Sequence, residues 1–132
     1  GLGHYATDRI APALENSAHW RLSAIVTGSE KKIPAWQQKW HISDQNIFNY
    51  TDFDRIANCD DVDAVYICLP NRLHLEFAQR AARAGKHVIV EKPMATSVAE
   101  GQLMVAACRS AGVKLAVGYR LRFNQLHRKL TH

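Results

Sequence analysis

Short runs of hydrophobic residues, rich in β-branched side chains, alternate with longer stretches in which hydrophobic residues recur every three or four positions. The short runs span residues 21–26, 63–69, 87–91 and 114–119, with a weaker run at 46–50. Such runs predict parallel strands buried on both faces, and the weaker run suits a sheet edge. The alternation predicts an α/β fold with a doubly wound parallel sheet.

The longer stretches predict helices. Residues 74–85 place small and apolar side chains on one stripe and end at Gly85, which can adopt the left-handed conformation that closes a helix. Residues 97–112 open with Ser97 and Glu100 in capping-box spacing. A short helix over 51–59 is expected to begin at Thr51 or Asp52.

The chain opens with the letters GLGHYA, in which Gly1, Gly3 and Ala6 satisfy the spacing of a phosphate-binding loop. The helix that follows, from about residue 5 to 16, would direct free N–H groups at the phosphates, and Pro12 predicts an irregularity in it. Such a loop normally follows the central strand of the sheet. We therefore expect the natural polypeptide to begin earlier, with about 5 to 8 apolar residues before Gly1.

The turn after the first predicted strand reads TGSEKK. A site for NAD usually carries an Asp or Glu there, which binds the ribose 2′-hydroxyl. A hydroxyl at Thr27 or Ser29, the open backbone of Gly28 and the two ammonium groups of Lys31 and Lys32 instead favour a 2′-phosphate, and therefore NADP over NAD. The alternative is a solvated turn followed by a charged helix start, and Glu30 leaves a ribose contact open.

Polar residues follow two further strands at the carboxyl edge of the sheet, where ligands of open α/β folds bind. Pro70 ends one strand, after which Asn71 could contact a cofactor ribose or cap a helix. His74 is a candidate for proton transfer, or for a structural or accessory contact.

The segment AGKHVIVEKPMATS places Glu91 and Lys92 directly after a buried strand, and Pro93 disfavours helical geometry at Lys92. An ammonium group at this edge can orient a substrate hydroxyl and assist its deprotonation as hydride leaves the same carbon. Glu91 can orient that lysine or bind the ribose of the cofactor. Lys92 is therefore the candidate catalytic residue.

Composition narrows the class of protein. The 132 residues suit one soluble globular domain, with 47% hydrophobic and 22% charged residues, and no run is long enough to span a membrane. The three cysteines are widely spaced, which predicts free thiols and neither a disulfide framework nor a metal site. The net charge of +5 suits an anionic small molecule, and because the basic residues lack interleaved aromatics we expect no nucleic-acid partner.

Together these motifs resemble the glucose–fructose oxidoreductase, inositol dehydrogenase and rhizopine-catabolism (Gfo/Idh/MocA) family. The segments GLGHYA, VTGS, DAVYICLPNRLH, AGKHVIVEKPMATS and VGYRLRFN follow the order and spacing of the family, and TGSEKK, NYTDFDRI and GYR are most similar to the glucose–fructose oxidoreductase branch. The resemblance implies a Rossmann fold for the cofactor domain. It also implies cofactor contacts from Leu2, Gly3, His4, Tyr5, Thr27, Gly28, Ser29, Lys32, Tyr50, Leu69, Asn71, His74, Glu91, Lys92 and Arg120.

The resemblance also implies a domain organisation. Residues 1–121 would be the dinucleotide-binding domain without its first strand, and residues 122–132 would begin a helix that leads to an absent α/β substrate domain. The resemblance implies an enzyme that transfers hydride between NADP(H) and a CH–OH group of a sugar or polyol and is a homo-oligomer when full length. The fragment alone would bind cofactor without full catalysis. A non-catalytic dinucleotide-binding sensor is the alternative, and the compartment stays open between cytoplasm and periplasm.

Overall fold

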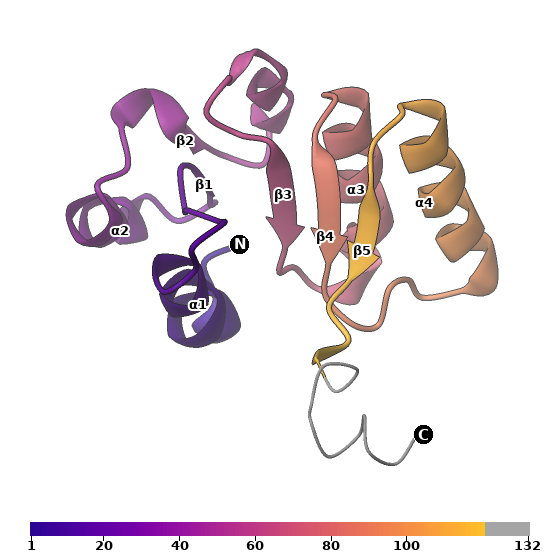
Figure 1. The fold of residues 1–132 in the computed structure, drawn as a ribbon, viewed down its shortest axis with the longest axis horizontal. Helices are drawn as coiled ribbons and strands as arrows, with labels where there is room; N and C mark the ends of the chain where they lie inside the picture. Colours follow the sequence, from indigo (N-terminus) through magenta and orange to yellow (C-terminus); the bar gives the residue numbers. More distant parts are fainter. Residues whose placement is uncertain (121–132) are drawn as a thin grey trace.

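A computed structural model describes residues 1–120 of the chain. Its strands form two parallel sheets (Figure 1). The smaller sheet pairs β1 (Ile25–Val26) with β2 (Ile47–Phe48). The larger sheet has the order β3–β4–β5, with β3 at Ala64–Ile67, β4 at His87–Val90 and β5 at Leu115–Val117. Because the strands within each sheet are parallel, their carboxyl ends lie at one edge of that sheet.

The helices lie between these strands in sequence. They are α1 (Ala11–Glu15), α2 (Ile33–Trp40), α3 (His74–Arg83) and α4 (Val98–Ser110). Four short 3₁₀ helices add turns at Glu30–Lys32, Asp44–Asn46, Phe53–Asn58 and Asn71–Leu73. Helices α3 and α4 cover one face of the β3–β5 sheet, while α1 and α2 lie beside β1 and β2 (Figure 1).

The predicted α/β fold with parallel strands is confirmed, and all five predicted strands are present in shorter form. Helix α2 was expected only as the charged helix start in the alternative interpretation of the TGSEKK turn, and its length was not predicted. It is short and begins just after two lysines, and its one buried side chain is Trp36, which packs on Trp40 with ring centroids 4.3 Å apart. One buried position in eight residues gives little periodic signal, and this explains why the pattern missed it.

The helix ends follow the predicted chemistry in part. The hydroxyl of Ser97 accepts the backbone N–H of Glu100 at 3.2 Å, as in a capping box, but the Glu100 carboxylate accepts the N–H of Thr96 at 2.9 Å instead of that of Ser97. Gly85 and Gly112 both adopt positive φ, 73° and 68°, directly after their helices. Because that region costs glycine little, both glycines terminate helices as predicted.

Two other predictions concern irregular turns. The expected helix at 51–59 is a 3₁₀ helix, Phe53–Asn58, and Asp52 occupies its N-cap position as predicted. The Asp52 side chain makes no capping hydrogen bond, and the Asn49 carboxamide accepts the N–H groups of Thr51 and Asp52, each at 2.8 Å. The irregularity expected at Pro12 is confirmed. Ala6–Ile10 form a π-helical turn before α1, since proline has no N–H to continue the regular bonding.

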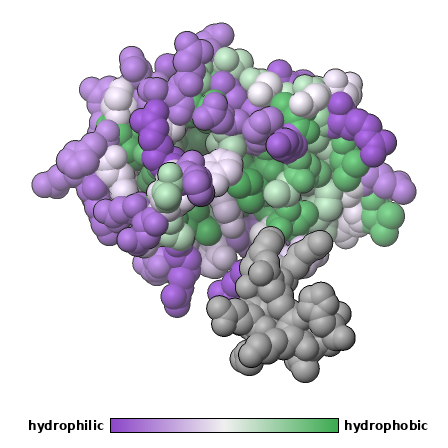
Figure 2. Space-filling model, in the orientation of Figure 1, coloured by the Kyte–Doolittle hydropathy of each residue, from purple (hydrophilic) through white to green (hydrophobic). Residues whose placement is uncertain are grey.

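The β3–β5 sheet buries one face more completely than the other. Val65, Ile67, Val88 and Val90 point toward the helices and belong to the main core, whereas Tyr66 and its neighbours on the opposite face are half-buried. Figure 2 shows hydrophobic surface gathered over this second face and α4. The prediction that these strands are buried on both faces is therefore wrong for the described residues.

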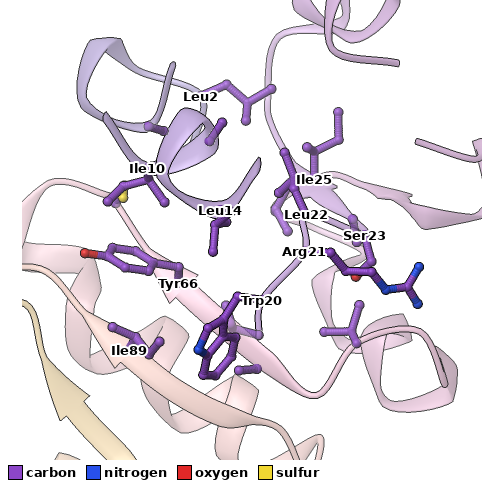
Figure 3. A pocket seen from close by; sticks show the side chains of 18 of the residues that line it. Leu2, Ile10, Leu14, Trp20, Arg21, Leu22, Ser23, Ile25, Tyr66 and Ile89 are labelled. Atoms are coloured by element: carbon purple, nitrogen blue, oxygen red, sulfur yellow. The ribbon is translucent and has the colours of Figure 1, made fainter. Parts of the chain in front are cut away.

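A cleft of about 340 Å³ separates the two sheets, and we call it the inter-sheet cleft. Strands β1 and β3 border it and are not hydrogen-bonded to each other. Its walls are mostly apolar and come from the first helical turns, the segment before β1, and the second face of the larger sheet (Figure 3). The labelled wall residues include Leu2, Ile10, Leu14, Trp20, Leu22, Ile25, Tyr66 and Ile89.

The predicted helix start at 122–132 lies outside the described residues. Within residues 1–120, no helix combines the length and the apolar character that crossing a bilayer requires. All three cysteines are free thiols; Cys59 and Cys108 are buried and Cys68 is half-buried.

Candidate functional site

The glycine loop lies against the end of β3. A Cβ atom at Gly1 would sit 2.8 Å from the carbonyl oxygen of Cys68 and 3.0 Å from a methyl group of Leu69, so only glycine fits there without a shift. Gly3 has no atom within 4 Å of such a Cβ, and its backbone is open to a ligand. The N–H of Thr7 bonds the Gly3 carbonyl at 3.0 Å, so the helix begins directly after the loop.

The turn after β1 continues the pairing of the smaller sheet. Thr27 is buried; its N–H donates to the carbonyl of Phe48 at 3.0 Å, and its hydroxyl accepts the N–H of Ser29 at 3.0 Å. A Cβ at Gly28 would lie 3.1 Å from the ring of Tyr50, and one at Gly1 would lie 3.2 Å from the Tyr50 hydroxyl. Tyr50 therefore packs against both glycines and joins the turn to the loop.

Lys32 makes a second connection between the turn and the loop. Its ammonium group donates to the carbonyl oxygen of Leu2 at 2.7 Å. A lysine ammonium has three N–H donors, so two remain for an anion bound at the loop. The cation predicted from TGSEKK thus lies beside the phosphate loop predicted from GLGHYA, although 30 residues separate them in sequence.

A second cleft, which we call the strand-end cleft, has a volume of about 580 Å³. It lies between the glycine loop and the carboxyl ends of the larger sheet's strands, the usual position of ligands in open α/β sheets. Three cationic side chains and one carboxylate line it, which favours an anionic ligand. The lining residues are Gly3, His4, Tyr5, Ala6, Arg9, Cys68, Leu69, Pro70, Glu91, Lys92, Gly118 and Arg120.

Glu91 and Lys92 leave β4 at the floor of this cleft. The N–H of Glu91 bonds the carbonyl of Ile67 at 3.1 Å and extends the sheet to this residue. The Glu91 carboxylate accepts the Tyr66 hydroxyl at 2.7 Å and the backbone N–H of Lys92 at 3.2 Å. Lys92 is exposed, and its ammonium group makes no ion pair within residues 1–120, which leaves it available to a ligand.

Burial and the Glu91 charge shape the acidity of nearby groups. The pKa of the Tyr66 phenol is raised, first by burial and then by its hydrogen bond and charge interaction with Glu91. The pKa of Tyr5 is also raised, first by burial and then by the charge of Glu91. Burial raises the pKa of the Cys68 thiol to about 11. These groups therefore stay protonated near neutral pH, and the Tyr66 hydroxyl donates to Glu91 there.

His74 has no exposed surface. One ring nitrogen lies 2.9 Å from the carbonyl oxygen of Leu69 and the other 2.9 Å from that of Pro93. These carbonyls belong to the loops after β3 and β4, which both border the strand-end cleft. The structure thus places His74 behind the cleft, where it joins the two loops, and supports the structural reading over proton transfer.

The predicted site residues fall into two groups, and whether they bind a cofactor stays a prediction. One group lines the strand-end cleft: Gly3, His4, Tyr5, Leu69, Pro70, Glu91, Lys92 and Arg120. The other surrounds the turn after β1 and the start of the loop: Gly1, Leu2, Thr27, Gly28, Ser29, Lys32 and Tyr50. Outside both lie the buried His74 and the exposed Asn71, which does not cap α3 because Leu73 occupies that position.

Sequence reasoning missed four residues at this site: Arg9, Cys68 and Gly118, which line the strand-end cleft, and Tyr66, which bonds Glu91. Arg9 lies in the π-helical turn Ala6–Ile10 and lines the strand-end cleft. The sequence feature that could have identified it is a basic residue six positions after Gly3. Tyr66 is a polar group within an apolar strand, and Gly118 is a glycine at a strand end. Both are signals that strand patterning alone leaves uninterpreted. Within residues 1–120, no group of three His, Cys, Asp or Glu side chains is arranged to hold a metal ion.

Residues 1–119 match the model of the Gfo/Idh/MocA oxidoreductase family, which has an NAD-binding Rossmann fold. The chain belongs to this family. The resemblance inferred from the motifs is therefore confirmed, as is the Rossmann class of the sheet, and the chain carries the nucleotide-binding domain of an oxidoreductase.

Solved structures of oxidoreductases have the same fold as this chain. The chain superposes with a TM-score of 0.91 and 48% identity on an aldose–aldose oxidoreductase from Caulobacter crescentus. The match covers 94% of this chain and 37% of that one. A 3-ketoreductase from Actinomadura kijaniata in complex with NADP gives a TM-score of 0.87 at 31% identity, with 98% and 40% covered.

A curated relative, D-xylose 1-dehydrogenase (NADP(+)) 2 from Haloferax volcanii, is 33% identical over 126 residues, which is 96% of this chain and 37% of that protein. The chain thus spans about two-fifths of the length of these family members.

Proposed function

We propose that this chain is the NADP-binding part of an oxidoreductase that moves a hydride between NADP(H) and a CH–OH group of a sugar or polyol. The observation that carries the proposal is the convergence, beside one glycine loop, of Lys32 on one side and the Glu91–Lys92 pair on the other. The relatives whose names specify a sugar reaction or NADP support the same choice.

The residues present fit a dinucleotide. Gly3 leaves open space at the start of a helix whose N–H groups can bind phosphate, and Gly1 allows the loop to lie directly on the end of β3. The strand-end cleft next to the loop is cationic. When bound there, NADP would supply the acceptor or donor of the hydride.

The choice of NADP over NAD rests on the turn after β1. Thr27, Gly28 and Ser29 occupy the positions where a ribose-binding carboxylate would be expected. The Ser29 side chain and the Lys32 ammonium can both donate to a 2′-phosphate, and the lysine already lies at the loop. Glu30 is exposed at the start of the next turn, and its carboxylate is the one that could still reach a ribose hydroxyl.

Lys92 would act on the substrate oxygen. In the oxidative direction the substrate carbon loses a hydride to the nicotinamide while its hydroxyl loses a proton, so the C–O single bond becomes a carbonyl. The Lys92 ammonium would hold that oxygen in place and stabilise its developing negative charge. The proton would pass to a general base in the remainder of the protein.

We further propose that the natural polypeptide is longer at both ends. The support is the share of the relatives that this chain spans and the inter-sheet cleft, which lies where a doubly wound sheet has its central strand. A strand joined to Gly1 would occupy this cleft, and an α/β substrate domain after residue 121 would supply the general base. The full-length enzyme would then be a homo-oligomer.

The test uses the full-length protein. We expect it to oxidise an aldose or polyol with NADP⁺, and the Lys92→Ala variant to lose about 10²-fold or more in kcat while the Kd for NADP⁺ stays within about threefold. Lys86→Ala is the control, since the Lys86 ammonium bonds the Cys59 carbonyl and Lys86 lines neither cleft. Unchanged turnover in Lys92→Ala would remove Lys92 from the mechanism. NADP binding without turnover of any sugar or polyol would favour the sensor.

A further inference from the structure

Tyr66 connects the two clefts of the molecule. Its ring forms part of the inter-sheet cleft wall, and its hydroxyl points away from Trp20 (Figure 3). That hydroxyl donates to one oxygen of the Glu91 carboxylate at 2.7 Å, and Glu91 lines the strand-end cleft. We propose that Tyr66 is a positioning residue for the Glu91–Lys92 pair, a role that rests on the hydride-transfer function proposed above.

The two oxygens of Glu91 are held by two different elements. Tyr66 on β3 binds Oε1, and the backbone N–H of Lys92 after β4 binds Oε2 at 3.2 Å. A carboxylate on a flexible side chain rotates freely about its last bond unless both ends are bound. The Tyr66 hydroxyl therefore fixes the plane of the carboxylate that lies next to Lys92.

Gly118 makes room for this bond. It follows β5, and its N–H donates to the carbonyl of Val90 at 2.8 Å, which holds its backbone against the end of β4. A Cβ atom at this position would lie 3.0 Å from Glu91 Oε1 and 3.2 Å from the Tyr66 hydroxyl. Any side chain here would press on both Tyr66 and Glu91, so the hydrogen bond between them requires glycine at position 118.

The Tyr66 phenol keeps its proton near neutral pH. Because burial and the Glu91 charge raise the pKa of Tyr66, its phenol stays a neutral donor. Phenylalanine at this position would keep the ring in the inter-sheet cleft and remove only the hydroxyl. The expected consequence is a rotated Glu91 and a misplaced Lys92, with the NADP phosphates little affected because backbone N–H groups of the glycine loop and the following helix would hold them.

The test compares Tyr66→Phe and Gly118→Ala with wild type in the full-length enzyme. We expect kcat to fall by about 10- to 100-fold in both variants, with the Kd for NADP⁺ within threefold. The primary deuterium isotope effect on kcat should rise because hydride transfer becomes slower. Gly101→Ala, where an added Cβ meets nothing within 4 Å, is the matched control and should behave as wild type.

The outcomes distinguish the positioning role of Tyr66 from the hydride-transfer function. An active wild type with unchanged kcat and isotope effect in both variants overturns the positioning role and leaves the proposed function intact. If wild type turns over no sugar or polyol, the proposed function fails, and crystal structures with NADP decide the positioning role. A single Glu91 orientation in wild type and a different one in both variants supports the positioning role. The same Glu91 orientation in wild type and both variants overturns it. Should Tyr66→Phe fail to fold, Gly118→Ala decides alone.

Discussion

The ammonium group of Lys32 lies 2.7 Å from the carbonyl oxygen of Leu2. This bond brings the turn after β1 to the glycine loop and leaves further N–H donors on the lysine for an anion. It places a cation beside the glycine loop that we propose as the phosphate site. The bond is therefore the structural basis for the cofactor preference that we propose.

Lys32→Met should weaken NADP⁺ binding about 10- to 100-fold, since a hydrogen bond to a charged group contributes about 1.5–3 kcal/mol. Affinity for NAD⁺ should change less than about threefold, because NAD⁺ lacks the 2′-phosphate. Titration of both cofactors into the full-length protein measures the two constants. Lys31→Met, one exposed residue earlier, is the control. A wild type that prefers NAD⁺ would contradict our interpretation of the turn.

His74 carries a prediction about stability. His74→Phe keeps a ring of similar size but removes both ring nitrogens, so the carbonyl of Leu69 or Pro93 that accepts the ring N–H loses its donor in the protein interior. The free energy of unfolding should fall by about 1–3 kcal/mol, the cost of one unsatisfied buried group. Urea denaturation checks this, with the exposed His19→Phe as the control. Equal loss in both variants would mean that the loops do not depend on His74.

Arg80 carries a prediction about pH. Its guanidinium binds both oxygens of Asp54, at 3.0 and 3.1 Å, and the Tyr50 carbonyl at 2.8 Å. The hydrogen bonds from Arg80 lower the pKa of Asp54 in the folded state, so this stabilisation is present above the unfolded pKa of an aspartate and is lost as the pH falls through the lowered folded value.

Arg80→Lys cannot make the two parallel bonds to Asp54 and should therefore be less stable than wild type at pH 7. The difference in the free energy of unfolding should shrink as the pH falls below about 4. Urea denaturation at several pH values measures it, and the exposed Arg109→Lys serves as the control. A difference that stays constant with pH would assign the effect to packing on Phe53 and Phe77 instead.

Particular residues show how far the sequence could be read. The strands, the glycine ends of α3 and α4 and the loop at Gly1 and Gly3 were predictable because local spacing encodes them. The Lys32–Leu2 and Tyr66–Glu91 bonds were not, because they join residues 30 and 25 positions apart and arise only once the strands are placed in order. His74 shows the same limit, since burial by two separate loops leaves no periodic trace.

The inter-sheet cleft carries the last prediction. Strands β1 and β3 present edges that do not bond each other, and apolar side chains line the space between them. An unpaired backbone group buried there would cost on the order of 1–3 kcal/mol, and a parallel strand that enters the cleft would satisfy the groups of both edges at once. Figure 1 places the start of the chain beside this gap, so a strand that continues from Gly1 would lie between β1 and β3.

Hydrogen exchange tests the arrangement. In the full-length protein, we expect backbone amides of both β1 and β3 to be protected to nearly the level of β4, which is paired on both sides. In the chain that begins at Gly1, amides on the cleft edges should exchange at least about tenfold faster, while those of β4 serve as the internal control. Equal exchange of the β1 and β3 amides in the two proteins would show that no strand enters the cleft.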